Sequence, residues 1–204
     1  MNFTPNLESI RVKEQYIQLY LPAPREVHDA YIHNKINFPF WAQVWPSAQA
    51  LAAFILDHPE IIENKKVLEL GAGLGLPSIV AARWAASVVC SDHEPAAIEY
   101  AALSARYHQL KNVSTRLLDW THFPADLDID VLLLSDINYE PASFELQQEL
   151  ILSLLKKNII ILLTTPQRLM AKSFVTPLMK YCRYQEEINI RHTEKEVIIS
   201  LFMF

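Results

Sequence analysis

The chain has 204 residues, of which 51% are hydrophobic and 20% are charged, a balance typical of a soluble globular protein. Its 18 basic and 23 acidic residues give a net charge of −5, and no run of basic residues provides the face that nucleic-acid binding needs. The longest apolar runs are far shorter than the roughly 20 residues of a membrane span, and residues 1–10 lack a signal-peptide pattern, so we expect a cytoplasmic or equivalent compartment with no membrane partner.

Residues 1–45 precede the main pattern of the chain, and we expect them to form a largely helical N-terminal extension that contributes to the functional site. Residues 15–21 alternate apolar Ile17, Leu19 and Leu21 with other side chains, which is typical of a strand or ribbon. Residues 46–57 place apolar side chains at helical spacing, which predicts a helix leading into the rest of the fold.

From residue 66 onward, short apolar runs alternate with amphipathic stretches, and this rhythm predicts βαβ units and a parallel sheet. We expect strands at residues 66–70, 87–91, 113–118, 129–135, 158–164, 183–191 and 196–204, the last two joined as an antiparallel hairpin through residues 192–195. Helices are expected to begin near Leu76 and after Asp92, and to cover residues 141–157 and 167–181. The predicted fold is one α/β domain over residues 1–204. It has a Rossmann-like, seven-stranded, mostly parallel sheet with an antiparallel last strand and helices on both faces.

Glycine is concentrated in a single short window between the first predicted strand of this sheet and the helix that follows it. An average composition would give about 14 glycines in a chain of this length, but there are three, Gly71, Gly73 and Gly75. Such clustering indicates positive φ angles or a close approach of the backbone to a ligand. Doubly wound folds bind ligands at this place, beyond the carboxyl ends of the strands.

The residues around the glycine loop narrow the class of ligand. Leu76 occupies the position where a dinucleotide fingerprint needs glycine, and no Gly-Lys-Ser/Thr sequence follows for phosphate binding. Glu69, at the end of the preceding strand, disfavours a pyrophosphate and suits a cationic group such as an amino-acid moiety with a sulfonium. Asp92 follows Gly71 by 21 residues, close to the roughly 20-residue offset at which an acid reaches ribose hydroxyls.

Four stretches now support a family resemblance: PFWAQVWPSAQALA at 39–52, VLELGAGLGLPSIVAA at 67–82, VCSDHEPAAIEYA at 89–101 and LLLSDINYEP at 132–141. From about residue 40 onward the sequence resembles the class I, seven-strand S-adenosylmethionine-dependent methyltransferases. Within that class it is similar to methyltransferase family 16, whose protein-lysine methyltransferases carry an Asp-x-x-Tyr motif after strand four. The pattern is also similar to that of electron-transfer flavoprotein β-subunit lysine methyltransferases and nicotinamide N-methyltransferase-like proteins.

The resemblance implies S-adenosyl-L-methionine as cofactor and gives each matching position a role. Trp45 would border the methionine part, Asp92 would bind the ribose and Trp120 would lie beside the adenine. Asp136 and Tyr139 match the motif beside the methyl acceptor, where the first would orient an amine and the second would line its channel. The expected cofactor-binding set is Trp45, Glu69, Gly71, Ala72, Gly73, Asp92, Trp120 and Ser135.

The acceptor remains open at this point. A protein lysine side chain is favoured, a small-molecule amine or pyridine is an alternative, and a cofactor-binding protein without catalysis is a second one. Ile137 and Asn138 replace the two prolines of the loop found in nucleobase-amine methyltransferases, which counts against a nucleobase acceptor. Asp92 could instead cap a helix and Asp136 a turn. The seven histidines form no metal-binding pattern, so we expect no metal, and the oligomeric state is left open.

Overall fold

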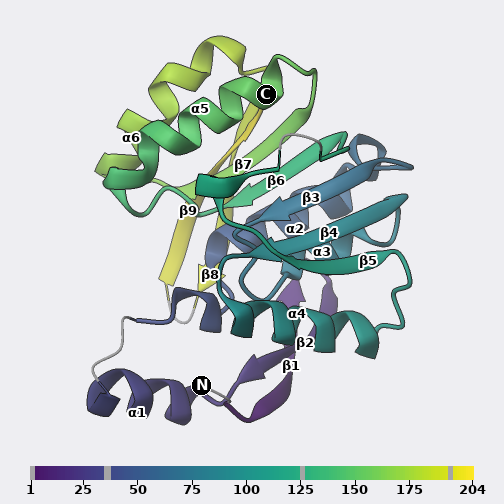
Figure 1. Cartoon of the computed structure of the whole chain (residues 1–204), viewed down its shortest axis with the longest axis vertical. Coiled ribbons are helices and arrows are strands. Elements are labelled where there is room, and N and C mark those ends of the chain that lie inside the picture. The colour runs from purple at the N-terminus through teal and green to yellow at the C-terminus, as the bar shows by residue number, and fades with distance from the viewer. Residues whose placement is uncertain (1–2, 35–37, 125–126, 193–194) are drawn as a thin grey trace.

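The structure is a computed structural model that describes residues 3–34, 38–124, 127–192 and 195–204. Within these residues a sheet of seven strands has the order β5-β4-β3-β6-β7-β9-β8 (Figure 1). Neighbours from β5 to β7 pair in parallel, while β9 is antiparallel to both β7 and β8. This confirms the predicted mostly parallel sheet with a reversed last strand. The strands are β3 (Lys66–Leu70), β4 (Ser87–Asp92), β5 (Val113–Leu117), β6 (Val131–Ser135), β7 (Ile160–Pro166), β8 (Tyr184–His192) and β9 (Lys195–Met203).

The order of the strands creates a switch point at the centre of the sheet. From β3 the chain adds β4 and then β5 on one side, and it later returns to place β6 and β7 on the other side of β3. The connections that leave β3 and β6 therefore diverge, and a crevice opens at the carboxyl ends of these strands. The glycine loop and the Asp136–Tyr139 motif both begin at this edge.

Apolar side chains cover both faces of the sheet, as a parallel sheet buried between helices requires. Along β6, Val131 and Leu133 belong to a buried cluster with α2 (Pro46–Asp57) and α3 (Leu76–Ala81). Leu132 and Leu134 alternate with them and pack on the opposite face, in a cluster with α5 (Phe144–Leu155) and α6 (Leu169–Val175). Helix α4 (Pro95–Tyr107) covers the edge formed by β4 and β5 (Figure 1).

Two of the predicted helices are interrupted. The expected helix at residues 141–157 starts with a short 3₁₀ turn, Pro141–Ser143, before α5 begins. The expected helix at 167–181 divides into α6 and a 3₁₀ segment, Thr176–Tyr181. Pro177 explains the second division, because proline lacks the N–H that would continue the α-helical hydrogen bonding.

The N-terminal extension differs from the prediction because it begins with a hairpin. Strands β1 (Pro5–Val12) and β2 (Gln15–Pro22) pair from Val12↔Gln15 to Pro5↔Pro22, and helix α1 (Pro24–Asn34) follows. Ile17 and Leu19, part of the predicted strand, are fully buried. Strand β1 escaped prediction because it is mostly exposed and lacks regular alternation.

Polar contacts hold this hairpin on α4, and the extension lies in the lower part of Figure 1. The backbone N–H of Tyr20 donates to Ser104 Oγ at 2.9 Å, and His108 Nε2 donates to the Gln18 carbonyl at 2.7 Å. Among the described residues, no helix is both long enough and apolar enough to span a bilayer.

Candidate functional site

The loop between β3 and α3 holds the three glycines in left-handed backbone conformations, with φ angles of 70° at Gly71, 53° at Gly73 and 75° at Gly75. A Cβ atom on Gly73 would lie 3.3 Å from the carbonyl oxygen of Trp41. One on Gly71 would lie 3.3 Å from Ile137 Cγ2 and 3.5 Å from the Trp120 ring. The glycines therefore serve both the turn itself and a close approach between the loop and its surroundings, as their clustering predicts.

Asp92, the last residue of β4, fastens this loop to the start of α4. One carboxylate oxygen accepts a hydrogen bond from the Gly73 N–H at 2.8 Å, and the other accepts from the Glu94 N–H at 3.0 Å. Although its side chain is only 4% exposed, Asp92 lines the pocket. Its hydrogen bond with the neighbouring imidazole raises the pKa of His93. The carboxylate thus tethers the backbone and still faces the pocket.

Glu69 requires a correction. The sequence places it against a cationic ligand, but the structure buries its carboxylate completely beneath α3 and outside the pocket lining. Oε2 accepts hydrogen bonds from the Ser78 N–H at 2.8 Å and from Ser78 Oγ at 2.5 Å. Burial raises the pKa of Glu69 to about 8, while the two bonds from Ser78 oppose that change. Its side chain secures the first turn of α3.

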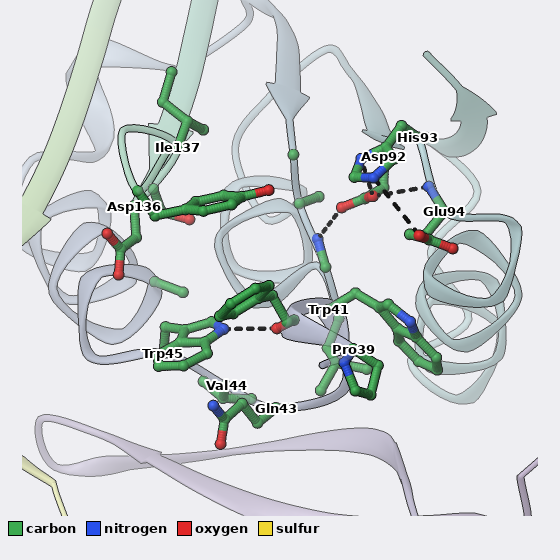
Figure 2. A pocket seen from close by; sticks show the side chains of 18 of the residues that line it. Pro39, Trp41, Gln43, Val44, Trp45, Asp92, His93, Glu94, Asp136 and Ile137 are labelled. Atoms are coloured by element: carbon green, nitrogen blue, oxygen red, sulfur yellow. Dashed lines mark hydrogen bonds and ion pairs between the residues drawn. The ribbon is translucent and has the colours of Figure 1, made fainter. Parts of the chain in front are cut away.

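A cavity of about 960 Å³ opens at the switch point (Figure 2). Its walls come from the glycine loop, the turn after β4, the turn after β6 and residues 38–45 of the N-terminal extension. Apart from Glu69, every predicted site residue lines this cavity: Trp45, Gly71, Ala72, Gly73, Asp92, Trp120, Ser135, Asp136 and Tyr139. The structure thus brings them together, while their contacts with a ligand stay a prediction.

Asp136 lies at the point where β6 turns into the motif, with a φ of 55° that is uncommon for a non-glycine residue. Its N–H donates to the Thr164 carbonyl at 2.9 Å, and its Oδ2 accepts from Arg168 Nη2 at 2.9 Å. Its Oδ1 is buried and has no hydrogen-bond partner among the described residues. Burial raises the pKa of Asp136, and the charge and hydrogen bond of Arg168 oppose this effect. Asp136 therefore combines a strained backbone conformation with a carboxyl group that is only partly paired.

Aromatic rings from two distant segments meet in the wall of the pocket. The indole N–H of Trp45 donates to the Phe40 carbonyl at 2.7 Å (Figure 2). The Phe40 ring lies 5.1 Å from that of Tyr139, centroid to centroid, at an interplanar angle of 31°. The Trp41 ring lies 5.5 Å from that of Tyr100, centroid to centroid, and Trp41 also lines the cavity.

Sequence reasoning missed several residues of this pocket. Arg168 follows β7 at the same edge of the sheet as Asp136, and its position after a strand was the available signal. Phe40 lies within the quoted stretch 39–52, yet nothing in that stretch distinguishes a ring facing the pocket from one in the core. In the parts of the chain that the structure describes, no group of three or more His, Cys, Asp or Glu side chains is arranged to hold a metal ion.

Comparison with known proteins now adds to this geometry. A family model described as lysine methyltransferase matches residues 28–180, which is more than half of the chain. This chain belongs to the lysine methyltransferase family. The matched segment of this family member includes the later part of α1, the glycine loop and the Asp136–Tyr139 motif, and it ends near the last residue of the 3₁₀ segment after α6.

Two curated relatives of this lysine methyltransferase family member carry different acceptor names. Histone-arginine methyltransferase METTL23 of Xenopus laevis is 36% identical over 56% of this chain and 51% of its own length. The human electron transfer flavoprotein beta subunit lysine methyltransferase is 32% identical over 61% of this chain and 48% of its own length. The chain thus spans about half the length of these relatives.

Solved structures support the fold. The N-methyltransferase NodS from Bradyrhizobium japonicum matches with a TM-score of 0.61 at 13% identity, covering 78% of this chain and 96% of that one. A putative RNA methyltransferase from Pyrococcus horikoshii matches with a TM-score of 0.58 at 14% identity, covering 76% and 81%. At such low identity the likeness concerns the Rossmann-like architecture that the family member shares with them.

Proposed function

We propose that the protein is an S-adenosylmethionine-dependent methyltransferase that modifies a lysine side chain of another protein. The observation that carries this proposal is the single cavity in which Asp92 and the glycine loop lie opposite Asp136 and Tyr139. The part formed by Asp92 and the glycine loop has the features of a nucleoside site, and the part formed by Asp136 and Tyr139 has those of an amine site. Membership of the lysine methyltransferase family supports the same conclusion.

The cavity fits the cofactor at three points. Trp120 and Ile137 line the cavity beside Gly71, and a flat adenine suits such apolar walls. Asp92 presents a carboxylate whose position is fixed by two backbone N–H groups, as ribose hydroxyls require. Trp45, with its N–H already bonded to a carbonyl, offers an apolar ring to the amino-acid end. When bound, the cofactor supplies a methyl group activated by a sulfonium.

The motif residues would prepare the acceptor. An ammonium group must lose its proton before its nitrogen can act as a nucleophile. The carboxyl group of Asp136, which lines the pocket, would accept an N–H hydrogen bond and orient the amine, while Arg168 holds its Oδ2 in place. The rings of Tyr139 and Phe40 line the approach and reduce the water around it.

Protein arginine is a second candidate acceptor, which the name of the METTL23 relatives supports. Like a lysine ammonium, a guanidinium is cationic and can donate N–H hydrogen bonds to Asp136. A small-molecule amine or pyridine remains the alternative, and the exposed rings of Tyr31, Phe38 and Phe40 at the pocket favour a larger partner over it. An acceptor protein is therefore the proposed partner.

Calorimetric titration with S-adenosylmethionine and, separately, NADH tests the cofactor. We expect saturable binding of the methyl donor alone, weakened at least about tenfold in Asp92→Ala by loss of a charged hydrogen-bonding group. Asp128→Ala, which removes an exposed carboxylate outside the pocket, is the matched control and should bind normally. Failure of the donor to bind the unmodified protein would overturn the proposal.

Methyl transfer from a labelled donor into cell lysate then tests the acceptor. Acid hydrolysis of the labelled protein should release N-methylated lysine, whereas methylated arginine would favour the second candidate. Asp136→Asn should reduce incorporation at least about tenfold while donor affinity is unchanged. Full incorporation by this variant would refute the role of Asp136, and label found only in small molecules would refute a protein acceptor.

A further inference from the structure

Five aromatic side chains form a continuous row along one wall of the pocket; we call Tyr31, Phe38, Phe40, Trp45 and Tyr139 the aromatic row. Ring centroids are 5.5 Å apart from Tyr31 to Phe38, 5.2 Å from Phe38 to Phe40 and 5.1 Å from Phe40 to Tyr139. Trp45 joins Phe40 at 6.1 Å. The row thus leads from α1 to the turn that carries Asp136.

The outer members of the row are unusually exposed. Tyr31 is 42% exposed, Phe38 37% and Phe40 48%. None of these three rings is a member of a buried hydrophobic cluster of the described residues. Contiguous exposed rings beside a cavity mark a binding surface rather than leftover core.

The charges around the row favour a cationic occupant. Four carboxylates line the same pocket, those of Asp92, Glu94, Asp136 and Glu140, against one guanidinium, that of Arg168, and one imidazole, that of His93. Arg168 is already paired with Asp136. Burial and then the charges of these carboxylates raise the pKa of Tyr139, the row member nearest to Asp136 in the chain. Aromatic faces attract cations, and this attraction grows as water is excluded.

We propose that the aromatic row is the entrance for the acceptor, and that its ring faces bind the cationic head and alkyl stem of the lysine side chain. This inference rests on the proposed function and adds a requirement for positive charge. Lysine keeps its charge when methylated, so the row would hold methylated and unmethylated side chains alike. A neutral pyridine or amine would gain much less from it.

The test uses two small probes that differ only in charge. One is N-acetyl-trimethyllysine methylamide, and the other is its uncharged analogue with carbon in place of the quaternary nitrogen. Each probe is titrated into the unmodified full chain and into the Phe38→Leu and Phe40→Leu variants, and its binding is followed by ligand-detected NMR. These exposed positions keep an apolar side chain after substitution. The control is Tyr16→Leu, which removes an even more accessible ring, 64% exposed, outside the pocket.

We expect the charged probe to bind the unmodified chain about 5- to 30-fold more tightly than the neutral one. That preference should fall at least about threefold in Phe38→Leu and Phe40→Leu and persist in Tyr16→Leu. Equal binding of the two probes, equal preference in all variants, or no binding at tens of millimolar would each overturn the proposal.

Two further measurements distinguish failure of this inference from failure of the proposed function. Calorimetry with S-adenosylmethionine should give the same affinity, within about twofold, for Phe38→Leu as for the unmodified chain. If the unmodified chain binds S-adenosylmethionine but does not prefer the charged probe, only the proposed role of the aromatic row is refuted. If the unmodified chain does not bind S-adenosylmethionine, the proposed function itself is refuted. Light scattering checks another occupant, since a dimer that dissociates in Phe38→Leu would assign the row to a second copy of the chain and refute the proposal.

Discussion

Replacing Glu69 with glutamine should remove most of the pH dependence of folding between pH 5 and 9. Glutamine keeps the shape of the side chain and its acceptor oxygen for the two bonds from Ser78, but it cannot ionise. In the folded protein, burial raises the pKa of Glu69 from 4.5 to about 8. Because the folded pKa lies above the unfolded one, protonation stabilises the native state, and this stabilisation is complete below pH 4.5.

The magnitude follows from the size of that change. Each pH unit between the two pKa values removes about 1.4 kcal/mol of stability, so that ionisation of Glu69 costs up to about 5 kcal/mol by pH 9. Urea unfolding followed by circular dichroism at intervals from pH 5 to 9 measures the free energy of unfolding of both proteins. The difference between Glu69→Gln and the unmodified chain should therefore grow with pH and level off above pH 8.

Glu149→Gln, which changes an exposed carboxylate on α5, is the control and should follow the unmodified chain. Parallel curves for Glu69→Gln and the unmodified chain over the whole range would mean that Glu69 ionises without penalty. Burial would then not raise the pKa of Glu69 in the folded protein. A change in the urea m-value of one protein alone would show instead that the substitution altered the two-state transition.

Gly75→Ala should destabilise the fold by about 2–4 kcal/mol, because alanine is strained at a φ of 75° and its Cβ would lie 2.9 Å from Cys90 Sγ. Adding Cys90→Ala should recover about 1 kcal/mol in a double-mutant cycle of urea unfolding, and strict additivity would contradict the clash. Arg168→Met should cost about 1–2 kcal/mol. Burial already raises the pKa of Asp136 in the fold, so the cost should be larger at pH 8 than at pH 4 in melting experiments, and a pH-independent loss would refute the pairing. Trp45→Phe should cost about 1 kcal/mol through its lost N–H bond to a carbonyl, and calorimetric unfolding unchanged within error would show that this bond is dispensable.

The sequence predicted those parts of the site whose position depends on local pattern. Gly71, Gly73 and Asp92 follow directly from strand ends in a parallel sheet, and the structure brings all three to one pocket. Glu69 was placed wrongly although a signal existed. Val67 and Glu69 are two residues apart on β3, and Val67 packs in the cluster that contains α3, so strand alternation turns Glu69 toward α3 as well.

Other features depend on tertiary contacts that no local pattern contains. Arg168 reaches Asp136 only because β6 and β7 pair with Ser135 opposite Thr164. The ring of Phe40 meets Tyr139 across almost a hundred residues of sequence. Strand β1 of the hairpin was not predicted, because a mostly exposed strand leaves little hydrophobic periodicity to detect.

The attachment of the hairpin has a consequence for how distant substitutions are interpreted. Ser104 on α4 accepts from the backbone of β2, and both the N–H and hydroxyl of Thr4, just before β1, donate to the carboxylate of Glu26 on α1. Helix α1 also carries Tyr31, so a series of contacts connects the buried Ser104 of α4 to the rim of the pocket. Substitutions that weaken these contacts would shift the rim of the pocket although they lie outside it. In a mutational scan, we therefore expect substitutions on α4 to change the affinity for the acceptor, although none of its residues after Ala96 lines the pocket.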